Sequence, residues 1–300
     1  MRNWEGFRLS EKPDTVPHMS GRTINQKVEG EPLKLWEGGD GSFPKPGELI
    51  EIHGHASMTM QDRRTLNLLL TNAWPRITED VEHVIKKSVL RGDRPGNERL
   101  SDTIDRLMKT IVEIKVTRDG KPARRKVQLL GPTDEHRDDL GNLYYRFLPE
   151  LIEIITLSDH WARLQAQAML ALTSKYSQAL YEMIQKRAGL TSKFREDFTI
   201  PEIRSVLGVP EGKMTRWADL YRFAIEPAEK QVATLSSCHV RIEPIKKGRL
   251  VVGVRMAWFP KDEEGLKLVY TQIEHQKTER RARKDKKKKR GMLGQGELGL

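Results

Sequence analysis

The chain has 300 residues, with 53 Lys or Arg against 42 Asp or Glu and a net charge of +11 at neutral pH. Hydrophobic residues at 37% and charged residues at 32% are typical of a folded protein with polar flanks, and the length suggests about two domains. No apolar run approaches the roughly 18 residues of a membrane span, no signal-peptide core follows Met1, and Cys238 is the only cysteine. These features argue against membrane-spanning and disulfide-stabilised proteins, so we expect a cytoplasmic one.

The positive charge is concentrated near the C-terminus. Residues 277–290 contain ten Lys or Arg against Glu279 and Asp285, a net +8, so the other residues together carry only +3. A like-charge block of this kind is usually disordered and often binds polyanions. We therefore expect residues 261–300 to form a basic disordered tail, which either solubilises the protein or adds phosphate contacts that do not read base sequence.

The N-terminal half begins with residues 1–45, which are rich in Gly, Pro and charge and have no sustained hydrophobic period. We expect this segment to be mostly disordered. Residues 46–157 then show the pattern of a first domain. The patterns predict a short strand over Glu48–His53 and three helices, one ending at Trp74-Pro75, one capped by Thr78 and carrying Val81, Val84, Ile85 and Val89, and one from Leu100 to Ile111.

A β-hairpin follows the third helix. Val112, Ile114 and Val116 alternate with polar residues up to Asp119-Gly120, a typical hairpin turn. Lys126–Leu130 is the expected return strand, and Leu143–Phe147 resembles a third strand.

Residues 158–260 repeat this order as a second domain. The expected elements are a helix capped by Asp159 that carries Trp161, Leu164, Ala168 and Leu172; a helix opened by Ser174 with a regular apolar stripe; a helix with the capping box Thr199-Ile200-Pro201-Glu202 and a stop at Gly208; a long helix from near Thr215 to Leu235, kinked or divided at Pro227; and two alternating strands joined by the turn Lys246–Arg249. Helix, helix, helix, strand, basic turn and strand is the order of a winged helix-turn-helix, which places one helix in a DNA groove. The sequence therefore predicts an α+β fold, mostly α, with two tandem winged helix-turn-helix domains.

The start of the recognition helix is where such a domain contacts base edges. The apolar residues of the helix from Thr215 must face the core, which leaves Arg216, Asp219 and Arg222 on the open side. An arginine can donate two hydrogen bonds to the O6 and N7 of guanine, whereas the wing-tip cations suit the DNA backbone or the minor groove. The DNA-binding residues predicted in this domain are Lys213, Thr215, Arg216, Arg222, Lys246, Lys247 and Arg249.

The first domain carries a parallel but less regular basic set, for which we expect phosphate contact more than base readout. The members that we predict to contact DNA are Arg99, Arg106, Lys109, Arg124 and Arg125. The alternative for these residues is an ordinary solvated surface.

Catalytic and cofactor motifs are weak. Rolling-circle nucleases hold a metal with two histidines around a hydrophobic residue, but His53-Gly54-His55 has glycine in the middle and no acidic ligand at a suitable spacing. Gly294–Gly299 matches a dinucleotide-binding pattern by its letters, yet no strand precedes it and only Leu300 follows. We expect no catalytic residue, no metal and no cofactor.

The second domain contains a group of motifs that is specific as a set. They are Ser174-Lys175-Tyr176 with Leu180-Tyr181-Glu182, Thr199-Ile200 with Ile203–Gly208, Trp217 with Asp219-Leu220, Glu226-Pro227-Ala228, and Ile242–Arg249. With this set the chain resembles the initiator Rep proteins of iteron plasmids, which have two winged-helix domains. The first domain fits more loosely, through Asp105–Lys109 and Tyr145–Phe147, and the match extends over about residues 46–259.

The resemblance implies a plasmid replication initiator in the bacterial cytoplasm. Such proteins bind direct repeats in double-stranded origin DNA, promote opening of the adjacent duplex, and recruit the host initiator and the host replicative helicase. As dimers, joined mainly through the first winged helix, they often repress their own gene. Arg216 and Arg222 stand where the family places base-contacting arginines, but Tyr221 and Phe223 replace further basic residues, so we expect a different sequence preference.

Two alternatives remain open from the sequence. A winged-helix transcriptional repressor that never opens DNA would have the same fold, and it differs by lacking an array of direct repeats beside an A·T-rich stretch. An origin-nicking nuclease would use His53, His55 and a tyrosine, and it differs by metal-dependent strand cleavage.

Overall fold

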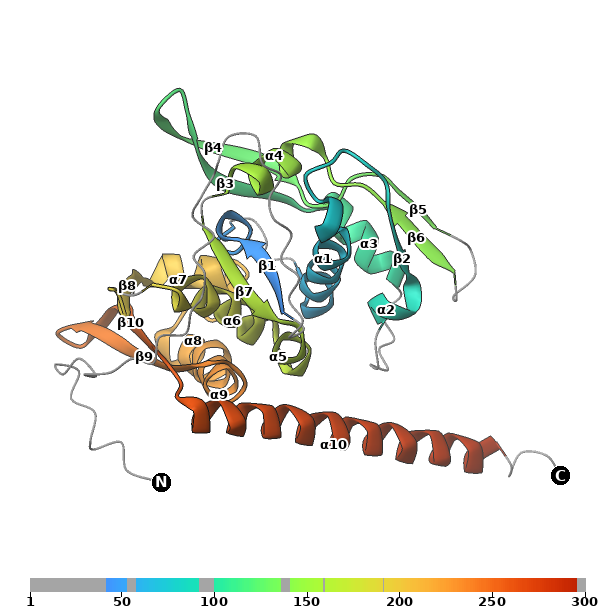
Figure 1. Ribbon diagram of the computed structural model, residues 1–300. Helices are drawn as coiled ribbons and strands as arrows, with labels where there is room; N and C mark the ends of the chain where they lie inside the picture. The colour runs from blue at the N-terminus through green and yellow to red at the C-terminus, as the bar shows by residue number, and fades with distance from the viewer. Residues whose placement is uncertain are drawn as a thin grey trace.

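The computed structural model describes residues 42–52, 58–91, 100–135, 141–158, 160–190 and 192–295. Most of the segment expected to be disordered, residues 1–41, lies outside this set, as do His53, His55, Arg99 and Gly296–Gly299. The described elements form two lobes, with one long helix along one side (Figure 1). Among the described residues, no helix is both long and apolar enough to cross a membrane.

The first lobe surrounds a hydrophobic core that extends from Leu49 to Ile155. Its main helix α1 begins with a capping box in which the side chain of Thr59 accepts from the backbone N–H of Asp62, and the Asp62 carboxylate accepts from the N–H of Thr59. The elements of the first lobe are η1 (Gly47–Leu49), α1 (Met60–Ala73), η3 (Trp74–Arg76), β2 (His83–Lys86), α2 (Lys87–Arg91), α3 (Leu100–Lys109), β3 (Ile111–Arg118), β4 (Lys121–Gln128), β5 (Thr133–Glu135), β6 (Asn142–Tyr145) and α4 (Pro149–Leu157).

The wing of this lobe is the hairpin β3–β4, as expected from its sequence. Asp119 and Gly120 both adopt positive φ, 52° and 73°, which the type I′ form of a two-residue hairpin turn requires. The strand β6 pairs with β2 and β5 in a separate three-stranded antiparallel sheet.

Two expectations for the first lobe are wrong. Glu48–His53 is not a strand in its described part: the strand β1 (Ser42–Pro46) precedes it, and Gly47–Leu49 is a 3-10 helix. The helix expected after Thr78 is a strand, β2, over His83–Lys86, and only Lys87–Arg91 is helical. The cause is tertiary, because β2 alternates buried and exposed residues while it pairs with β6.

The second lobe has a core drawn mainly from residues 162–273. Its elements are β7 (Trp161–Gln165), α5 (Ala166–Ala171), α6 (Lys175–Ala188), β8 (Arg195–Thr199), α7 (Ile200–Leu207), α8 (Trp217–Leu220), the π-helical turn η4 (Tyr221–Ile225), α9 (Glu226–Leu235), β9 (Cys238–Lys247) and β10 (Leu250–Pro260). The Ser174 cap, the Thr199–Glu202 capping box and the left-handed Gly208 with φ 66° are all present. Local sequence signals therefore determine the start of α6 and both ends of α7.

The helix expected to begin at Asp159 is wrong in its first half. Trp161–Gln165 is the strand β7, which pairs antiparallel with β1, and the helix α5 begins at Ala166. Some elements, among them α4 and β8, have no counterpart in the sequence-based prediction. The strand β8 pairs with β10 and completes a three-stranded sheet in the order β8-β10-β9.

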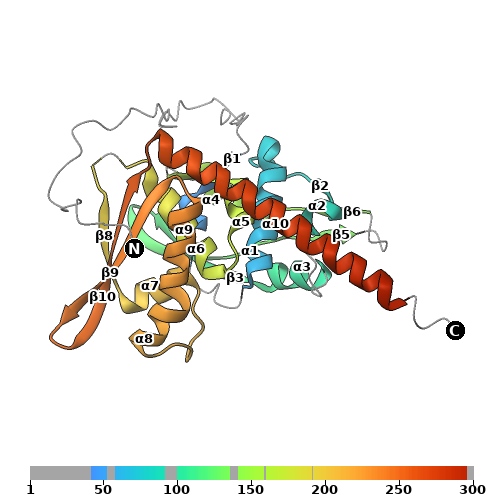
Figure 2. The ribbon, with the colours of Figure 1, turned by 90° about the horizontal axis from the view of Figure 1, so that it is seen from below.

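The C-terminal segment also differs from the expectation. Residues 261–300 are not disordered throughout, because Glu263–Gln295 forms one helix, α10. Lys, Arg, Glu and Gln are good helix formers, and Glu263 pairs with Lys267 one turn later at 3.0 Å. Val269 and Ile273 are buried in the second core, where α10 lies against α9 and α5, and the helix then extends past the body of the protein (Figures 1 and 2).

These elements confirm the predicted fold class of an α+β chain with two winged-helix domains.

Candidate nucleic-acid interface

The second lobe presents a helix-turn-helix made of α7, the turn 208–216, and the helical segment that starts with α8. The recognition helix begins at Trp217 with Arg216 as its N-cap, two residues later than expected from the sequence. The segment remains helical to Leu235, but η4 interrupts it with a π-turn in which the N–H of Glu226 donates to the carbonyl of Tyr221. Pro227, which has no backbone N–H, lies in the first turn of α9 just after this π-turn. The helical segment therefore continues through the proline, with an irregular turn before it, where the sequence predicts a kink or a division.

A side chain of α7 holds the turn in place. The guanidinium of Arg204 donates to the carbonyl oxygens of Met214 at 2.6 Å, Lys213 at 2.7 Å and Pro210 at 3.4 Å. Met214 needs such support, because its φ of 49° is unfavourable for a residue with a side chain. Sequence reasoning missed Arg204, since its partners are backbone carbonyls whose positions only the folded turn defines.

The open face of the recognition helix carries the expected residues. Arg216 is 81% exposed and donates to both carboxylate oxygens of Asp219, at 2.8 and 3.2 Å. The hydrogen bonds and the negative charge of Asp219 raise the pKa of Arg216. Arg222 is also exposed and stacks over the ring of Phe223 at 5.4 Å, whereas Leu220 and Ala224 are buried.

The wing of this lobe is the hairpin β9–β10. Lys246, Lys247 and Arg249 are exposed around its tip, and Gly248 has a φ of 62° that the turn requires. The hairpin projects from the body beside α8, in both views of the ribbon (Figures 1 and 2). Lys213 and Thr215 are exposed in the turn before the recognition helix. The structure thus leaves the predicted residues of the second domain exposed on the turn, the recognition helix and the wing of one lobe.

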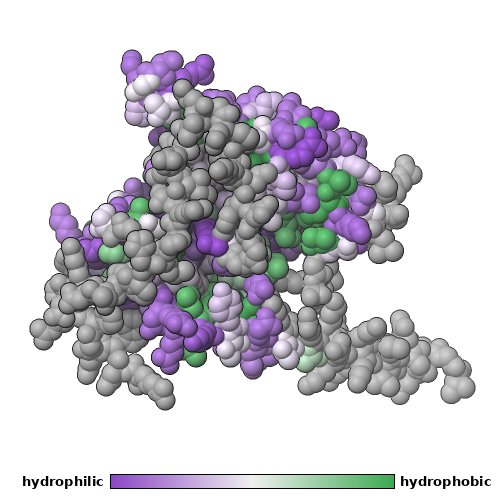
Figure 3. Space-filling model, in the orientation of Figure 1, coloured by the Kyte–Doolittle hydropathy of each residue, from purple (hydrophilic) through white to green (hydrophobic). Residues whose placement is uncertain are grey.

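The basic residues of the first lobe are dispersed. Lys109 is exposed at the end of α3, and Arg124 and Arg125 of β4 pair with Glu113 at 3.1 Å and with Glu153 at 2.8 Å. Arg106 has a different environment, since it donates to both carboxylate oxygens of the buried Asp62 and so ties α3 to the start of α1. The hydrophilic tip of the β3–β4 hairpin stands out in the space-filling view (Figure 3).

A buried polar network joins the two lobes. The carboxylate of Glu182 on α6 accepts from Lys45 at 2.9 Å, from Arg63 at 2.7 Å and from Asn67 at 2.8 Å, and all four side chains are buried. Burial alone would raise the pKa of Glu182, but the charges of Lys45 and Arg63 outweigh it and lower that pKa. Since Arg63 and Asn67 belong to α1 and Lys45 to β1, this network holds α1 of the first lobe against α6 of the second.

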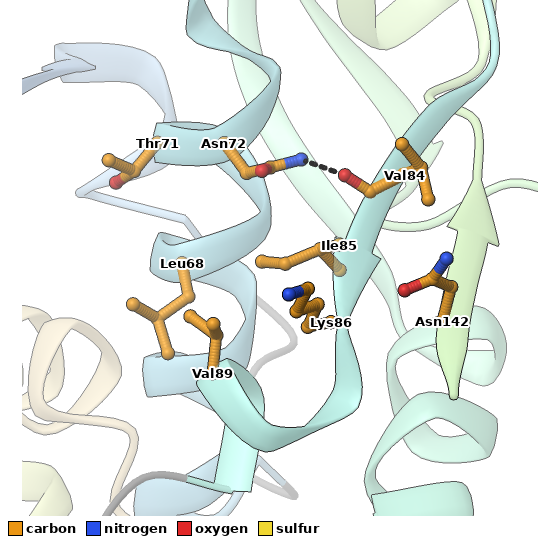
Figure 4. Close-up of a pocket in the computed structure, with 8 residues that line it drawn as sticks. All are labelled: Leu68, Thr71, Asn72, Val84, Ile85, Lys86, Val89 and Asn142. Carbon is orange, nitrogen blue, oxygen red and sulfur yellow. Dashed lines mark hydrogen bonds between the residues drawn. The ribbon is translucent and has the colours of Figure 1, made fainter. Parts of the chain in front are cut away.

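The first lobe also has an apolar surface groove of about 550 Å³ between α1 and β2. Figure 4 shows its lining, in which Asn72 donates to the carbonyl of Val84 at 3.0 Å. Val84 and Val89 are each 50% exposed there. The hydrophobic patch over β2 in Figure 3 corresponds to this region.

Comparison with known proteins agrees with the resemblance found in the sequence. Two family models match, "Initiator Replication protein, WH1" over residues 45–185 and "Initiator Rep protein, WH2" over residues 199–258. The crystal structure of Pi initiator protein in complex with iteron DNA has a similar fold, with a TM-score of 0.56 and 14% identity over 75% of this chain and 99% of that chain. A comparison with curated proteins found no match. The chain belongs to the initiator replication proteins that carry two winged-helix domains, WH1 and WH2.

Proposed function

We propose that this protein initiates plasmid replication by binding direct repeats, or iterons, in double-stranded origin DNA. One observation carries the proposal: Arg216 and Arg222 are exposed on the recognition helix, and Lys246, Lys247 and Arg249 are exposed at the tip of the wing of the same lobe. Such a surface supplies base contacts in the major groove and phosphate contacts beside it. Membership of the initiator family supports a role in DNA binding and not in catalysis, and the similar Pi initiator has been solved with iteron DNA.

The two winged-helix domains would have different roles in DNA binding. Residues 158–260 would read the bases, and residues 46–157 would contact the DNA backbone through Lys109, Arg124 and Arg125 and mediate self-association. The packing supports this division, because buried residues up to Ile155 belong mainly to one core and those from Ala162 onward to the other. Arg106 would have a structural role and no DNA contact, since it binds the fully buried carboxylate of Asp62, whereas the acids paired with Arg124, Arg125 and Arg216 are partly exposed.

Self-association would use the groove between α1 and β2. Val84 and Val89 expose apolar side chains there, and β2 is an edge strand of its sheet, so a second copy would cover surface that is otherwise exposed to water. The dimer would repress the protein's own gene. Opening of the adjacent duplex and recruitment of the host initiator and helicase complete the proposal, and they rest on the family alone.

Footprinting of the purified protein on the DNA that flanks its gene tests this function. Protection of several evenly spaced direct repeats is the expected result, and it would also give the length of one site. Protection of a single inverted repeat over a promoter would instead favour the transcriptional repressor. Supercoiled origin DNA incubated with the protein and Mg²⁺ should remain intact. Nicked DNA would instead favour the origin-nicking nuclease.

A further inference from the structure

The tip of the β9–β10 hairpin exposes an apolar side chain among its cations. Leu250, the first residue of β10, is 73% exposed, more than any other large hydrophobic side chain of the described residues. Val252 is exposed two residues later. A loop that only binds phosphates would carry cations and hydrogen-bond donors at the positions of Leu250 and Val252. The two exposed apolar side chains therefore indicate a second kind of contact.

The register of the hairpin shows how Leu250 is presented. Leu250 lies directly opposite Lys247, and Val251 lies opposite Lys246. Because cross-strand neighbours share a face and successive residues alternate, Leu250 and Lys247 lie on one face of the hairpin and Val251 and Lys246 on the other. Each face of the tip therefore combines an aliphatic side chain with a lysine.

A register shift and a close backbone contact lie just below the tip of the hairpin. The register shifts between Val251 and Gly253, which marks a β-bulge, and a bulge increases the local twist of the strand. A Cβ at Gly253 would lie 2.5 Å from the carbonyl oxygen of Phe198 on β8, so only glycine permits this close approach. The strand is therefore closely packed from Gly253 onward, whereas Leu250 and the two-residue turn before it are exposed.

We propose that Leu250 is a minor-groove wedge: it enters the minor groove next to the major groove occupied by the recognition helix and partly unstacks one base step. Apolar side chains inserted in this way kink the duplex, and the wing-tip lysines and arginine would contact the phosphates on either side. The inference rests on the proposed function, because the wing must lie on DNA.

The wedge would contribute specificity without a hydrogen bond to any base. Pyrimidine–purine steps such as TA and CA are the easiest to unstack, so the protein would favour one of them at the position that faces Leu250. It would also bend its site toward the major groove. Both effects differ from those of Arg216 and Arg222, which act through base edges.

The test uses the full-length protein and a linear duplex that carries one repeat protected in the footprint, without the neighbouring A·T-rich stretch. Permanganate reactivity reports unstacked thymines, and fluorescence energy transfer between the duplex ends reports bending. Wild-type protein should create one reactive step and a bend. Leu250→Ser should abolish both and weaken binding about tenfold, as expected when one aliphatic side chain no longer packs against the bases.

Three control variants sharpen the result. Leu250→Met preserves an apolar side chain of similar volume and should retain reactivity and bending. Lys247→Ala should retain both while it reduces the slope of log affinity against log salt by about 0.9, the value for a single phosphate neutralised by a lysine. Leu250→Lys should lose the reactive step even where the added charge restores affinity. Circular dichroism of each variant checks that the fold is intact.

The proposal is overturned if Leu250→Ser unstacks and bends the repeat like wild type, or if the wild-type complex is neither reactive nor bent. Stronger binding by Leu250→Lys with an unchanged bend would also overturn it, because Leu250 would then lie against the backbone. If the wild-type protein protects no repeat at all, the proposed function fails and the wedge fails with it, which the footprint alone reveals.

Discussion

At the scale of single residues, Arg216 and Arg222 are the side chains on which base reading should depend. Arg216 already forms a two-point contact with a carboxylate, and the O6 and N7 of guanine offer the same geometry. We expect Arg216→Ala or Arg222→Ala to cost about 1–3 kcal/mol of specific binding and to relax the preference at one base pair. Anisotropy competition with repeats changed one base pair at a time measures both effects.

Arg76 provides the matched control for this experiment. It is an exposed arginine paired with an acid three residues later, Glu79, as Arg216 is with Asp219, but it lies in the first lobe outside the proposed interface. Arg76→Ala should bind like wild type. An Arg216 or Arg222 variant that discriminates among repeats as well as wild type would show that recognition lies elsewhere.

Arg204 should act on recognition indirectly. Its guanidinium bonds to three turn carbonyls, and a lysine cannot reach all three with one ammonium group. Because each hydrogen bond to a charged group contributes about 1.5–3 kcal/mol, Arg204→Lys should reduce stability and weaken specific binding more than non-specific binding. Thermal unfolding and the ratio of the two affinities measure these effects. Lys213→Ala is the control: it keeps the backbone carbonyl that Arg204 binds, and as a predicted phosphate contact it should weaken specific and non-specific binding alike and leave their ratio unchanged. Equal specificity ratios for wild type and Arg204→Lys would refute the positioning role.

At the scale of elements, the helix α10 carries most of the net positive charge of the chain and extends beyond the two lobes. Replacing the ten Lys or Arg of residues 277–290 by Gln keeps helix propensity and removes the charge. We expect all DNA binding to weaken alike and the salt slope to fall by about 0.9 for each phosphate that these side chains neutralise in the wild-type complex. Lys→Arg changes at 286–289 conserve the charge and should leave the slope intact. An unchanged slope in the Gln variant would reduce this helix to a solubilising role.

The strand β2 and helix α2 carry the proposed contact between copies. Val84→Asp places a charge in the apolar groove, so the dimer should weaken at least tenfold in sedimentation equilibrium, by about 1.4 kcal/mol or more. Leu157→Asp is the control, because Leu157 is comparably exposed, at 53%, but lies outside the groove. The Val84 variant should still protect the direct repeats. A dimer that survives this change has its interface on another surface.

At the scale of the whole molecule, the Glu182 network determines how the lobes are joined. Because the folded pKa of Glu182 is lowered, its stabilisation is complete above the unfolded pKa of about 4.3 and is lost as the pH falls through the folded pKa. Burial lowers the pKa of Lys45, so its charge is costly without this partner.

Glu182→Gln leaves Lys45 and Arg63 without their anion, and we expect it to cost about 3–5 kcal/mol in urea unfolding at neutral pH. The variant should also lose part of the acid-dependent decrease in stability. Lys267→Ala, which breaks an exposed pair, should cost less than about 1 kcal/mol. If both variants unfold alike, the network does not hold the lobes together.

The local sequence determined much of the fold and most of the open recognition surface. The capping box at Thr199, the stop at Gly208, the apolar stripe of α6 and the turns at Asp119-Gly120 and Gly248 depend on backbone and side-chain preferences that act within a few residues. The helical spacing around Leu220 and Ala224 then leaves Arg216 and Arg222 exposed. Such features are readable because their physical cause lies next to them in the chain.

Only the tertiary structure decided the features whose partners are distant in sequence. Two segments, His83–Lys86 and Trp161–Gln165, are strands because they pair with β6 and β1. The first turns of α10 are stabilised by packing against α9 and α5. Arg204 binds the carbonyl oxygens of a folded turn, and Arg106 binds a buried aspartate. In the sequence, neither arginine can be told from the other basic residues. A glutamate is usually exposed to solvent. Glu182 is buried because three side-chain donors from α1 and β1 hydrogen-bond its carboxylate in the folded protein.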